Sequence, residues 1–451
     1  MKRKRNKSFI AILLVKKVRT QKIHIDMKVI ISLILFLTIF HVNGQRILLL
    51  NGLLHVGNGS VVETSAIGIQ DGKILFVKNA LTSNFDAQQW DTIIKLDGQH
   101  IYPGFVATNS TLGLNEIDAV RATRDFQDVG EFNPHVRAQI AYMVESRVIE
   151  TVKSNGILIT QTTPRGGIIS GTSSLMFLDG WNWEDATLLK DDGIHLNWPD
   201  ANNGDSWNTE VNSKNKNIDY KSQCAEIFDF FQMASVYAKD KKTTNFDQRL
   251  EAMVDCFKGT KRVFIHASEL QQLTDIISFV SEFKIPFPVI VGGHDAYLLG
   301  ARLKDAQIPV MLQRVHSLPN SEDENVALPY QLASLLQKEE ILFCLQNEGD
   351  MEAMNTRNLP FQAGTAMAYG LTEEQAVRSI SLSACEILGI DKNYGSIEAG
   401  KSATLFVSKG SALDMRSNQV TLIIRDGQVV DHHNFQEKLY LKYKKKYEEK
   451  P

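Results

Sequence analysis

The segment 101–114 combines a short apolar run with residues placed where metal ligands could stand. The run ends in a Pro-Gly-Phe sequence, and Asn109 and Thr111 follow it. Alternate residues of a strand point to the same face, so these two side chains could hold one ion between them if both were good ligands. Neutral imidazole suits zinc, whereas Asn and Thr offer only weak neutral oxygens. The segment has the outline of a metal site without its strong ligands.

The elements around this segment predict a barrel. Between about 101 and 390, apolar strand patterns alternate with helical patterns, which is typical of a parallel sheet. A segment of this length suits a (β/α)8 TIM-like barrel in an α/β fold. Strands are expected at 156–160, 262–266, 287–291, 308–312 and 341–345, and helices at 269–283, 295–306 and 328–338.

The two flanks of the barrel are expected to form one small β-sandwich domain from residues 45–100 and 391–433. Short apolar runs there are separated by Asn-Gly or Asp-Gly pairs, which are strong hairpin signals. The charged tail 434–451 predicts a solvated helix end, and the polar segment 202–221 predicts an exposed loop. Hairpin turns are expected at Asn51-Gly52, Asp71-Gly72 and Asp426-Gly427.

The composition is that of a globular protein with more than one core. The chain has 451 residues, of which 43% are hydrophobic and 22% charged, and its formal net charge is −3. This length predicts one large domain plus a smaller one. The balance of charge, without a basic domain, gives no support to nucleic-acid binding.

Residues 1–44 are predicted to be an N-terminal extension and a secretory signal. Lys28 precedes an apolar run at 29–40, which is short for a membrane span. The residues before Met27 hold nine Lys or Arg and one acid, so Met27 is the expected start. We expect an exported protein, periplasmic or secreted, that begins near Gln45 and has no stable membrane span. A membrane anchor is the alternative.

The four cysteines, at 224, 256, 344 and 385, show no CxxC pair. Buried free thiols are the simpler interpretation. A disulfide between Cys224 and Cys256, formed after export, is the alternative.

Several motifs are spread over nearly all of the predicted mature chain. They are Asp71-Gly-Lys-Ile74, Asp97-Gly98 with Tyr102-Pro-Gly-Phe105, Arg357-Asn-Leu-Pro-Phe361 with Ala363-Gly-Thr-Ala366, Gly370-Leu-Thr-Glu-Glu-Gln-Ala376, Leu388-Gly-Ile390 and Gly395-Ser-Ile-Glu-Ala-Gly-Lys401. Together they resemble the amidohydrolase superfamily, in the branch similar to imidazolonepropionase-like enzymes. The resemblance implies metal-dependent hydrolysis of C–N bonds other than peptide bonds, with the metal activating water at the carboxyl ends of the barrel strands.

The chain departs from the family pattern at the first strand. The family has Asp-x-His-x-His after Pro-Gly-Phe, but this chain has Ala107, Asn109 and Thr111 there. The resemblance implies metal ligands at the ends of two later strands, at His266 and His294. The alternatives are a strand-end histidine that bonds to the backbone and a residue at a helix N-terminus.

The last barrel strand should end in an acid that acts as ligand and proton acceptor. Glu348 has the better register for this catalytic role, and Asp350 is the other candidate. Either could act as a general base if burial raised its pKa, and a surface-loop acid is the alternative. With His266 and His294, three protein ligands plus water would suffice for zinc. We expect one divalent metal, zinc first, or none.

The candidate residues for substrate binding are Asn109, Thr111, Arg165 and Arg357. Arg165 lies in the Gly/Ser-rich segment 163–174, whose backbone could approach a ligand, and a structural turn is the alternative. Arg357 could orient the loop after the last strand. Trp181 and Trp183 could line a pocket.

Two functions remain open. The first is an exported hydrolase of small amides with a degenerate metal site, and the superfamily resemblance favours it. The second is an inactive homologue that binds a small molecule, or that joins an active paralogue in an oligomer. The missing first-strand ligands favour the second function chemically. The substrate cannot be read from the sequence, because a fold does not fix the chemistry of its site.

Overall fold

The computed structural model describes residues 45–202, 217–239, 245–349 and 351–448. Apart from Gln45, these residues belong to one compact unit that begins at Arg46. The predicted signal at 1–44, the candidate acid Asp350 and most of the predicted loop at 202–221 lie outside the described residues. Within the described part, no helix has the length and apolarity needed to cross a membrane.

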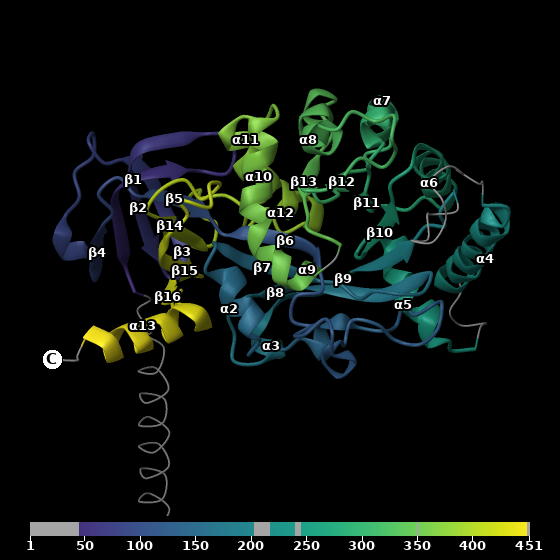
Figure 1. Ribbon diagram of the computed structural model, residues 1–451, viewed down its shortest axis with the longest axis horizontal. Coiled ribbons are helices and arrows are strands. Elements are labelled where there is room, and N and C mark those ends of the chain that lie inside the picture. Colours follow the sequence, from purple (N-terminus) through teal and green to yellow (C-terminus); the bar gives the residue numbers. More distant parts are fainter. Residues whose placement is uncertain (1–44, 203–216, 240–244, 350, 449–451) are drawn as a thin grey trace, which may run out of the picture. The chain divides into compact units, whose positions relative to one another are not determined.

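The first of two sheets is a nearly closed barrel of eight strands, ordered β6 to β13 along the chain (Figure 1). A parallel bridge between Thr108 and Gln346 joins its first and last strands. The five strands expected from the sequence are all present within a few residues. The strands are β6 (Phe105–Ser110), β7 (Ile157–Thr162), β8 (Ile169–Phe177), β9 (Thr187–Asn197), β10 (Arg262–Ala267), β11 (Pro288–Gly292), β12 (Val310–Leu312) and β13 (Phe343–Leu345).

One strand departs from the parallel barrel that was expected. β8 runs antiparallel to both β7 and β9, so the segment 163–174 is a turn only in its first part. Its Ser- and Gly-rich sequence resembled a loop, but every residue of β8 is buried. Gly171, with φ +146°, is required because a Cβ there would lie 2.7 Å from the carbonyl oxygen of Val136. Close packing, rather than turn formation, explains the small residues.

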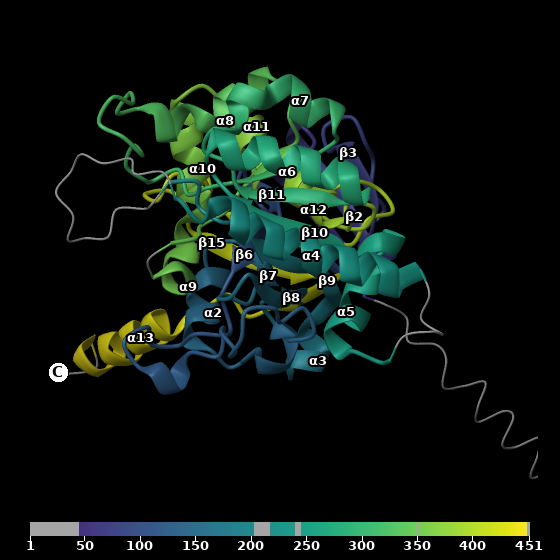
Figure 2. The ribbon, with the colours of Figure 1, turned by 90° about the vertical axis from the view of Figure 1, so that its right-hand side faces the viewer.

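Helices cover the outside of the barrel (Figure 2). α6 begins at a capping box formed by Glu269 and Gln272, and its apolar stripe packs on β10. The expected helix at 328–338 has the predicted bounds. The helices here are α2 (Arg147–Lys153), α4 (Tyr220–Lys239), α5 (Gln248–Lys258), α6 (Leu270–Phe283), α7 (Gly300–Asp305), α8 (Leu328–Lys338), α9 (Glu352–Asn355), α10 (Leu359–Ala368), α11 (Glu373–Ser379) and α12 (Leu382–Leu388).

The second sheet contains strands from both flanks of the barrel, as predicted, because β5 pairs with β14. Hairpins form at Asp71-Gly72 and Asp426-Gly427, where positive φ angles allow tight turns. The hairpin expected at Asn51-Gly52 is wrong, because this pair lies inside β1 at a register shift. The strands are β1 (Ile47–His55), β2 (Val61–Gln70), β3 (Lys73–Asn79), β4 (Thr92–Lys95), β5 (His100–Pro103), β14 (Leu405–Ser408), β15 (Val420–Arg425) and β16 (Gln428–Val430).

The charged tail forms α13 (Phe435–Glu448), in which no residue is buried, as expected for a solvated helix. All four cysteines are free, and Cys256, Cys344 and Cys385 are buried. The alternative disulfide between Cys224 and Cys256 is therefore not formed.

Inward-facing side chains change from apolar to polar along the barrel. Ile159 and Phe264 belong to an apolar cluster that α12 also contacts. Two residues further along the same faces come Gln161 and His266. This change places a polar layer near the carboxyl ends of the strands, which is the end where barrel active sites lie.

Candidate functional site

Seven residues of the polar layer form a closed series of contacts, here called the polar ring, through their side chains and, at Asn109, also through the backbone N–H. Its members come from five strands and from the loop after β13, and five of them are almost completely buried. In order around the ring they are Asn109, Gln161, Asp192, Ser173, His195, His266 and Glu348.

One half of the ring surrounds the buried carboxyl group of Asp192. The Gln161 amide donates to Asp192 Oδ2 at 2.8 Å, and the Ser173 hydroxyl donates to Oδ1 at 2.8 Å. The Asn109 backbone N–H donates to Gln161 Oε1 at 3.0 Å. Burial raises the pKa of Asp192 to about 6, against the opposing effect of these two donors and of the Arg262 charge.

The other half of the ring contains two histidines in contact. His195 Nε2 lies 3.0 Å from Ser173 Oγ, and His195 Nδ1 lies 2.9 Å from His266 Nε2. Because the Ser173 hydrogen points to Asp192, His195 donates from Nε2 and accepts at Nδ1. Burial, and then the charges of His266 and Arg165, hold the pKa of His195 well below its usual value. His195 is therefore neutral at pH 7.

Ser173, His195 and Asp192 have the composition of a nucleophilic triad, but their burial excludes that role. Ser173 and His195 have no exposed surface, and Asp192 is only 2% exposed. A substrate cannot reach the Ser173 hydroxyl, which is also bonded to the carboxylate rather than only to the imidazole. The trio therefore forms part of the wall of the site.

Glu348 closes the ring at its exposed side. Its Oε2 accepts from Asn109 Nδ2 at 2.8 Å, and its Oε1 lies 3.7 Å from His266 Nδ1. Burial alone would raise the pKa of Glu348, but His266, Arg165 and the Asn109 amide together lower it to about 2. A general base at this position required a raised pKa, so Glu348 is a stable anion and a weak base.

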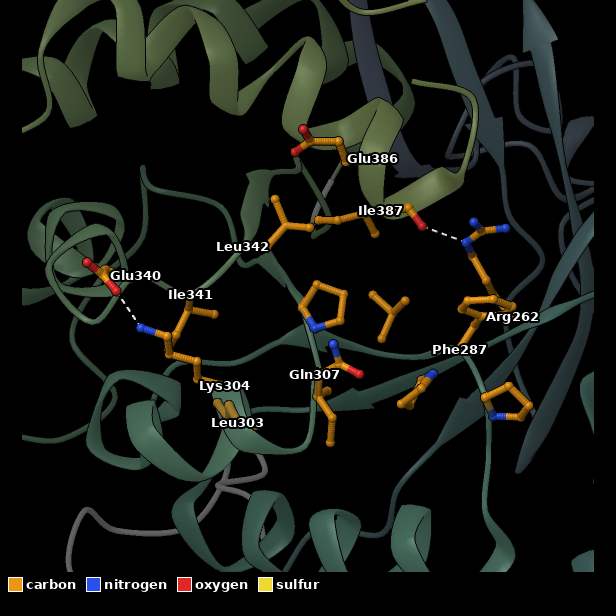
Figure 3. A pocket seen from close by; sticks show the side chains of 15 residues that line it. Arg262, Phe287, Leu303, Lys304, Gln307, Glu340, Ile341, Leu342, Glu386 and Ile387 are labelled. Carbon is orange, nitrogen blue, oxygen red and sulfur yellow. Dashed lines mark hydrogen bonds and ion pairs between the residues drawn. The ribbon is translucent and has the colours of Figure 1, made fainter. Parts of the chain in front are cut away.

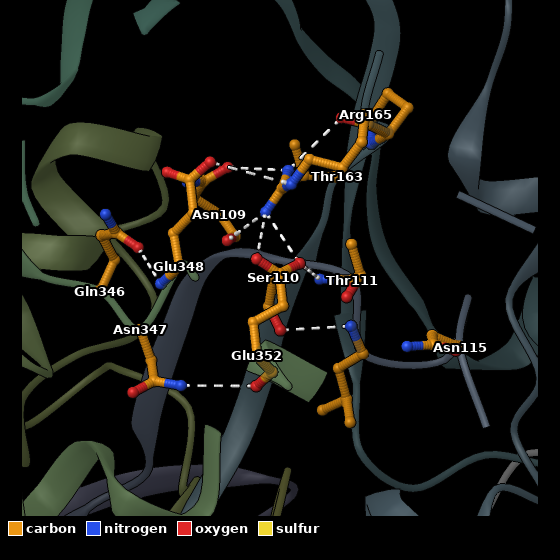
Figure 4. Close-up of polar contacts among 12 residues, drawn as sticks. Asn109, Ser110, Thr111, Asn115, Thr163, Arg165, Gln346, Asn347, Glu348 and Glu352 are labelled. Atoms are coloured by element: carbon orange, nitrogen blue, oxygen red, sulfur yellow. Dashed lines mark hydrogen bonds and ion pairs between the residues drawn. The ribbon is translucent and has the colours of Figure 1, made fainter. Parts of the chain in front are cut away.

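Arg165 connects the first and last barrel strands (Figure 4). Its Nη1 donates to Asn109 Oδ1 at 3.0 Å, and its Nη2 donates to the Asn109 carbonyl at 2.9 Å and to Glu352 at 3.0 and 3.1 Å. Its Nε lies 3.9 Å from Glu348 Oε1. Asn109 has φ +49°, a left-handed conformation that Asn tolerates. Arg165, Asn109, Glu348 and Glu352 are here called the arginine corner.

Thr111 lies beside the arginine corner through its backbone. Its N–H donates to Glu352 Oε1 at 3.0 Å, whereas its buried hydroxyl has no hydrogen-bond partner among the described residues. Neither Thr111 nor Asn109 presents a free oxygen pair to an ion. Sequence reasoning did not identify Glu352, whose only signal was its place two residues after a candidate acid.

The other predicted residues have hydrogen-bond partners outside the polar ring. His294 is buried, with Nδ1 3.0 Å from Gln313 Nε2 and Nε2 3.1 Å from Glu324 Oε1. Arg357 contributes its carbonyl oxygen to Asn155. Trp181, expected in a pocket, is instead 90% exposed.

Within the described part of the chain, the side chains at this mouth of the barrel do not form a ligand set that fits a divalent metal. Among the described residues, the one group of three His, Cys, Asp or Glu side chains with ligand atoms within 4.8 Å is Asp431, His432 and His433, just before α13. His266, His294 and Glu348 are thus not gathered into one ligand set. At the first strand, the guanidinium of Arg165 already uses the oxygens of Asn109. A three-ligand metal site stays a prediction without support from this geometry.

Two cavities lie at opposite ends of the barrel. One, of about 620 Å³, lies beyond the end of β9 and is lined by Asn197 and by Trp198, whose backbone N–H donates to the His266 carbonyl; no side chain of the polar ring lines it. The other, of about 340 Å³, lies where β10 to β12 begin and has mostly apolar walls such as Phe287 and Leu342 (Figure 3). Since barrel sites lie at the carboxyl ends of strands, the first cavity is the candidate ligand space.

A family model matches part of this chain, and solved structures share its fold. Residues 331–430 match the model of the Amidohydrolase family. No curated protein sequence matches the chain significantly. Among solved structures, an amidohydrolase from Thermotoga maritima MSB8 aligns with a TM-score of 0.72 at 22% identity, over 86% of this chain and 100% of that one.

More distant structures share the same fold. A prolidase complexed with N-methylphosphonate-L-proline has a TM-score of 0.52 at 13% identity, over 86% of this chain and 100% of its own. An adenosine deaminase from Xanthomonas campestris with bound zinc has a TM-score of 0.50 at 12% identity, over 89% and 98%. The family-model match and the shared fold confirm that the chain resembles the amidohydrolase superfamily.

Proposed function

We propose that the protein binds a small polar molecule at the carboxyl end of its barrel and does not hydrolyse it by metal-dependent chemistry. The observation that carries this proposal is the closed polar ring. Its strand-end donors and acceptors bond to one another, so they are not free to ligate an ion. Metal-activated water needs an ion with an open coordination position.

The state of Glu348 supports the same proposal. An effective general base has a pKa near the working pH, whereas the pKa of Glu348 is lowered to about 2. The cavity of about 620 Å³ beyond the end of β9 has the size of a small-molecule site. Its walls include Asn197 and the carboxylates of Glu131 and Glu226, so we expect a ligand rich in hydrogen-bond donors.

The hydrolase alternative rests on the family and the fold. It would use His266, His294 and Glu348 or Asp350 around one divalent metal, zinc first, on a small amide. The neighbours with hydrolase names make this the default for the fold, but function depends on the site. The proposal has two further parts. One is a role as partner subunit of an active paralogue. The other is export directed by residues 27–44.

Turnover assays on the purified full chain test the proposal. The panel contains N-acyl amino acids, dipeptides and cyclic amides, each with and without added zinc or manganese. We expect thermal stabilisation by at least one compound and no turnover of any. Metal-dependent turnover that is lost in His266→Ala, but kept in the control His316→Ala outside the ring, would establish the hydrolase instead.

A further inference from the structure

We infer that the Arg165 guanidinium is a built-in cation that stands where a metal ion would otherwise join the first and last barrel strands. This inference deepens the proposed function and rests on its metal-free site. The first observation behind it is the position of Arg165. Arg165 contacts Asn109 at the end of β6 and two acids after β13, which are the segments where the resemblance placed the first-strand and last-strand ligands.

The charges at the corner require a cation. Glu348 and Glu352 face the same space, with side chains only 34% and 12% exposed. Two carboxylates in a partly buried site are unfavourable unless a positive group compensates them. Arg165, itself only 18% exposed, supplies that charge. Burial alone would lower the pKa of Arg165, but Glu352 and Glu348 raise it, so the guanidinium stays charged.

The guanidinium makes several hydrogen bonds to oxygen atoms at once. Its donors reach Asn109 Oδ1, the Asn109 carbonyl, the Pro164 carbonyl and both oxygens of Glu352. A planar guanidinium makes such multiple contacts to oxygen, which a lysine ammonium cannot reproduce. A divalent ion in the same space would lie against this fixed positive charge and would be repelled.

The backbone that carries Arg165 is also fixed. The Arg165 N–H donates to the Phe126 carbonyl at 2.7 Å. Two residues on, Gly167 has φ +65°, and a Cβ there would lie 2.7 Å from the Gly130 carbonyl oxygen. The turn between β7 and β8 therefore presents the side chain in one direction. The site is filled by the chain itself before any ligand arrives.

The test compares the full chain with Arg165→Ala, Arg165→Lys and the control Arg137→Ala. Arg137 also pairs with one carboxylate, that of Asp191 at 2.7 Å, but outside the ring. We expect Arg165→Ala to lower Tm by roughly 5–10 °C and Arg165→Lys to recover only part of it. Arg137→Ala should change Tm little.

Zinc uptake by equilibrium dialysis gives the second readout. With Arg165 removed, the carboxylates of Glu348 and Glu352 lose the cation that compensates them, so Arg165→Ala should bind zinc between them and regain part of its Tm when zinc is added. The unmodified chain and Arg137→Ala should bind none at this corner. Zinc binding by the unmodified chain that is lost in Glu348→Gln, or an Arg165→Ala variant as stable as the control, would overturn the inference.

A charge-compensated variant covers the case in which Arg165→Ala does not fold. Arg165→Gln combined with Glu348→Gln and Glu352→Gln removes the cation and both acids together. It should fold and be more stable than Arg165→Gln alone, and the reverse order would overturn the inference. Failure of every compound of the panel to stabilise the unmodified chain would defeat the proposed function but leave the role of Arg165 intact.

Discussion

The arginine corner and the surroundings of His294 lie at the same mouth of the barrel, but Arg165 and His294 have different kinds of partner. At the arginine corner, one cation contacts two acids that follow β13 and the side-chain and carbonyl oxygens of Asn109 at the end of β6. At His294, one ring bonds to Gln313 and Glu324 in the following loop. The first arrangement links distant strands, whereas the second secures a single loop. The comparison shows that side chains from the neighbouring loops determine the role of a polar residue at a strand end.

The largest difference between the two regions is expected when Glu352 is removed from the arginine corner and Glu324 from the surroundings of His294. In Glu352→Ala, Arg165 loses its closest carboxylate and the Thr111 N–H loses its acceptor, so the free energy of unfolding should fall by about 3–5 kcal/mol. In Glu324→Ala, one hydrogen bond to the His294 ring is lost, at about 1–2 kcal/mol. Urea unfolding measures both, and equal losses would remove the distinction between the two regions.

The next effect concerns the buried carboxyl group of the ring. Because the folded-state pKa of Asp192 is raised to about 6, the folded state retains this proton better than the unfolded chain does. Stability from this group is full below its unfolded pKa of about 4 and is lost as pH rises through 6, by about 3 kcal/mol. Asp192→Asn should flatten the stability profile between pH 4 and 6.

The matching measurement is Tm against pH for both proteins, read as a difference. His195 contributes the opposite slope below pH 6.5, because its pKa is lowered in the fold, but it is present in both proteins. A difference curve that stays level across this window would contradict the raised pKa of Asp192.

A smaller effect separates the two strand-end histidines. His266 lies near Glu348 and lowers the pKa of that carboxyl group, whereas His294 bonds to Glu324. In His266→Asn the pKa of Glu348 should therefore rise from about 2 towards its ordinary value, and in His294→Asn it should not move. Carbon-detected NMR titration of the Glu carboxyl groups gives both values. A shift in both variants would mean that the histidines act on one site.

The smallest change is expected at Thr111. Its hydroxyl is buried without a partner among the described residues, so it contributes no hydrogen bond there. Thr111→Val keeps the shape and removes an unsatisfied polar group, so stability should be unchanged or higher by up to about 1 kcal/mol. A loss of more than that in thermal unfolding would show that the hydroxyl binds something the corner needs.

Most of the fold could be predicted from the sequence because periodicity and turn chemistry are local. The strands around Ile159, Phe264 and Cys344 and the turns at Asp71 and Asp426 follow from a few neighbouring residues. The antiparallel β8 did not follow, because small residues that serve close packing look the same in sequence as residues that serve a loop.

The site was only partly predictable, because its contacts join residues far apart in the chain. Arg165 and Asn109 were recognised as candidates for substrate binding, but their contact depends on the turn between β7 and β8. Glu352, Gln161 and Asp192 have no motif, and only the barrel geometry brings them to the same layer. Glu348 could act as a base only if its pKa were raised, and nearby charged groups lower that pKa instead.

The zinc content of the unmodified full chain tests the central claim most directly. After equilibration with zinc and dialysis, elemental analysis gives the number of ions retained per chain. A barrel mouth filled by Arg165 predicts no ion there, so His266→Ala and Glu348→Gln should leave the content unchanged. One tightly held zinc per chain that disappears in either variant would contradict the account.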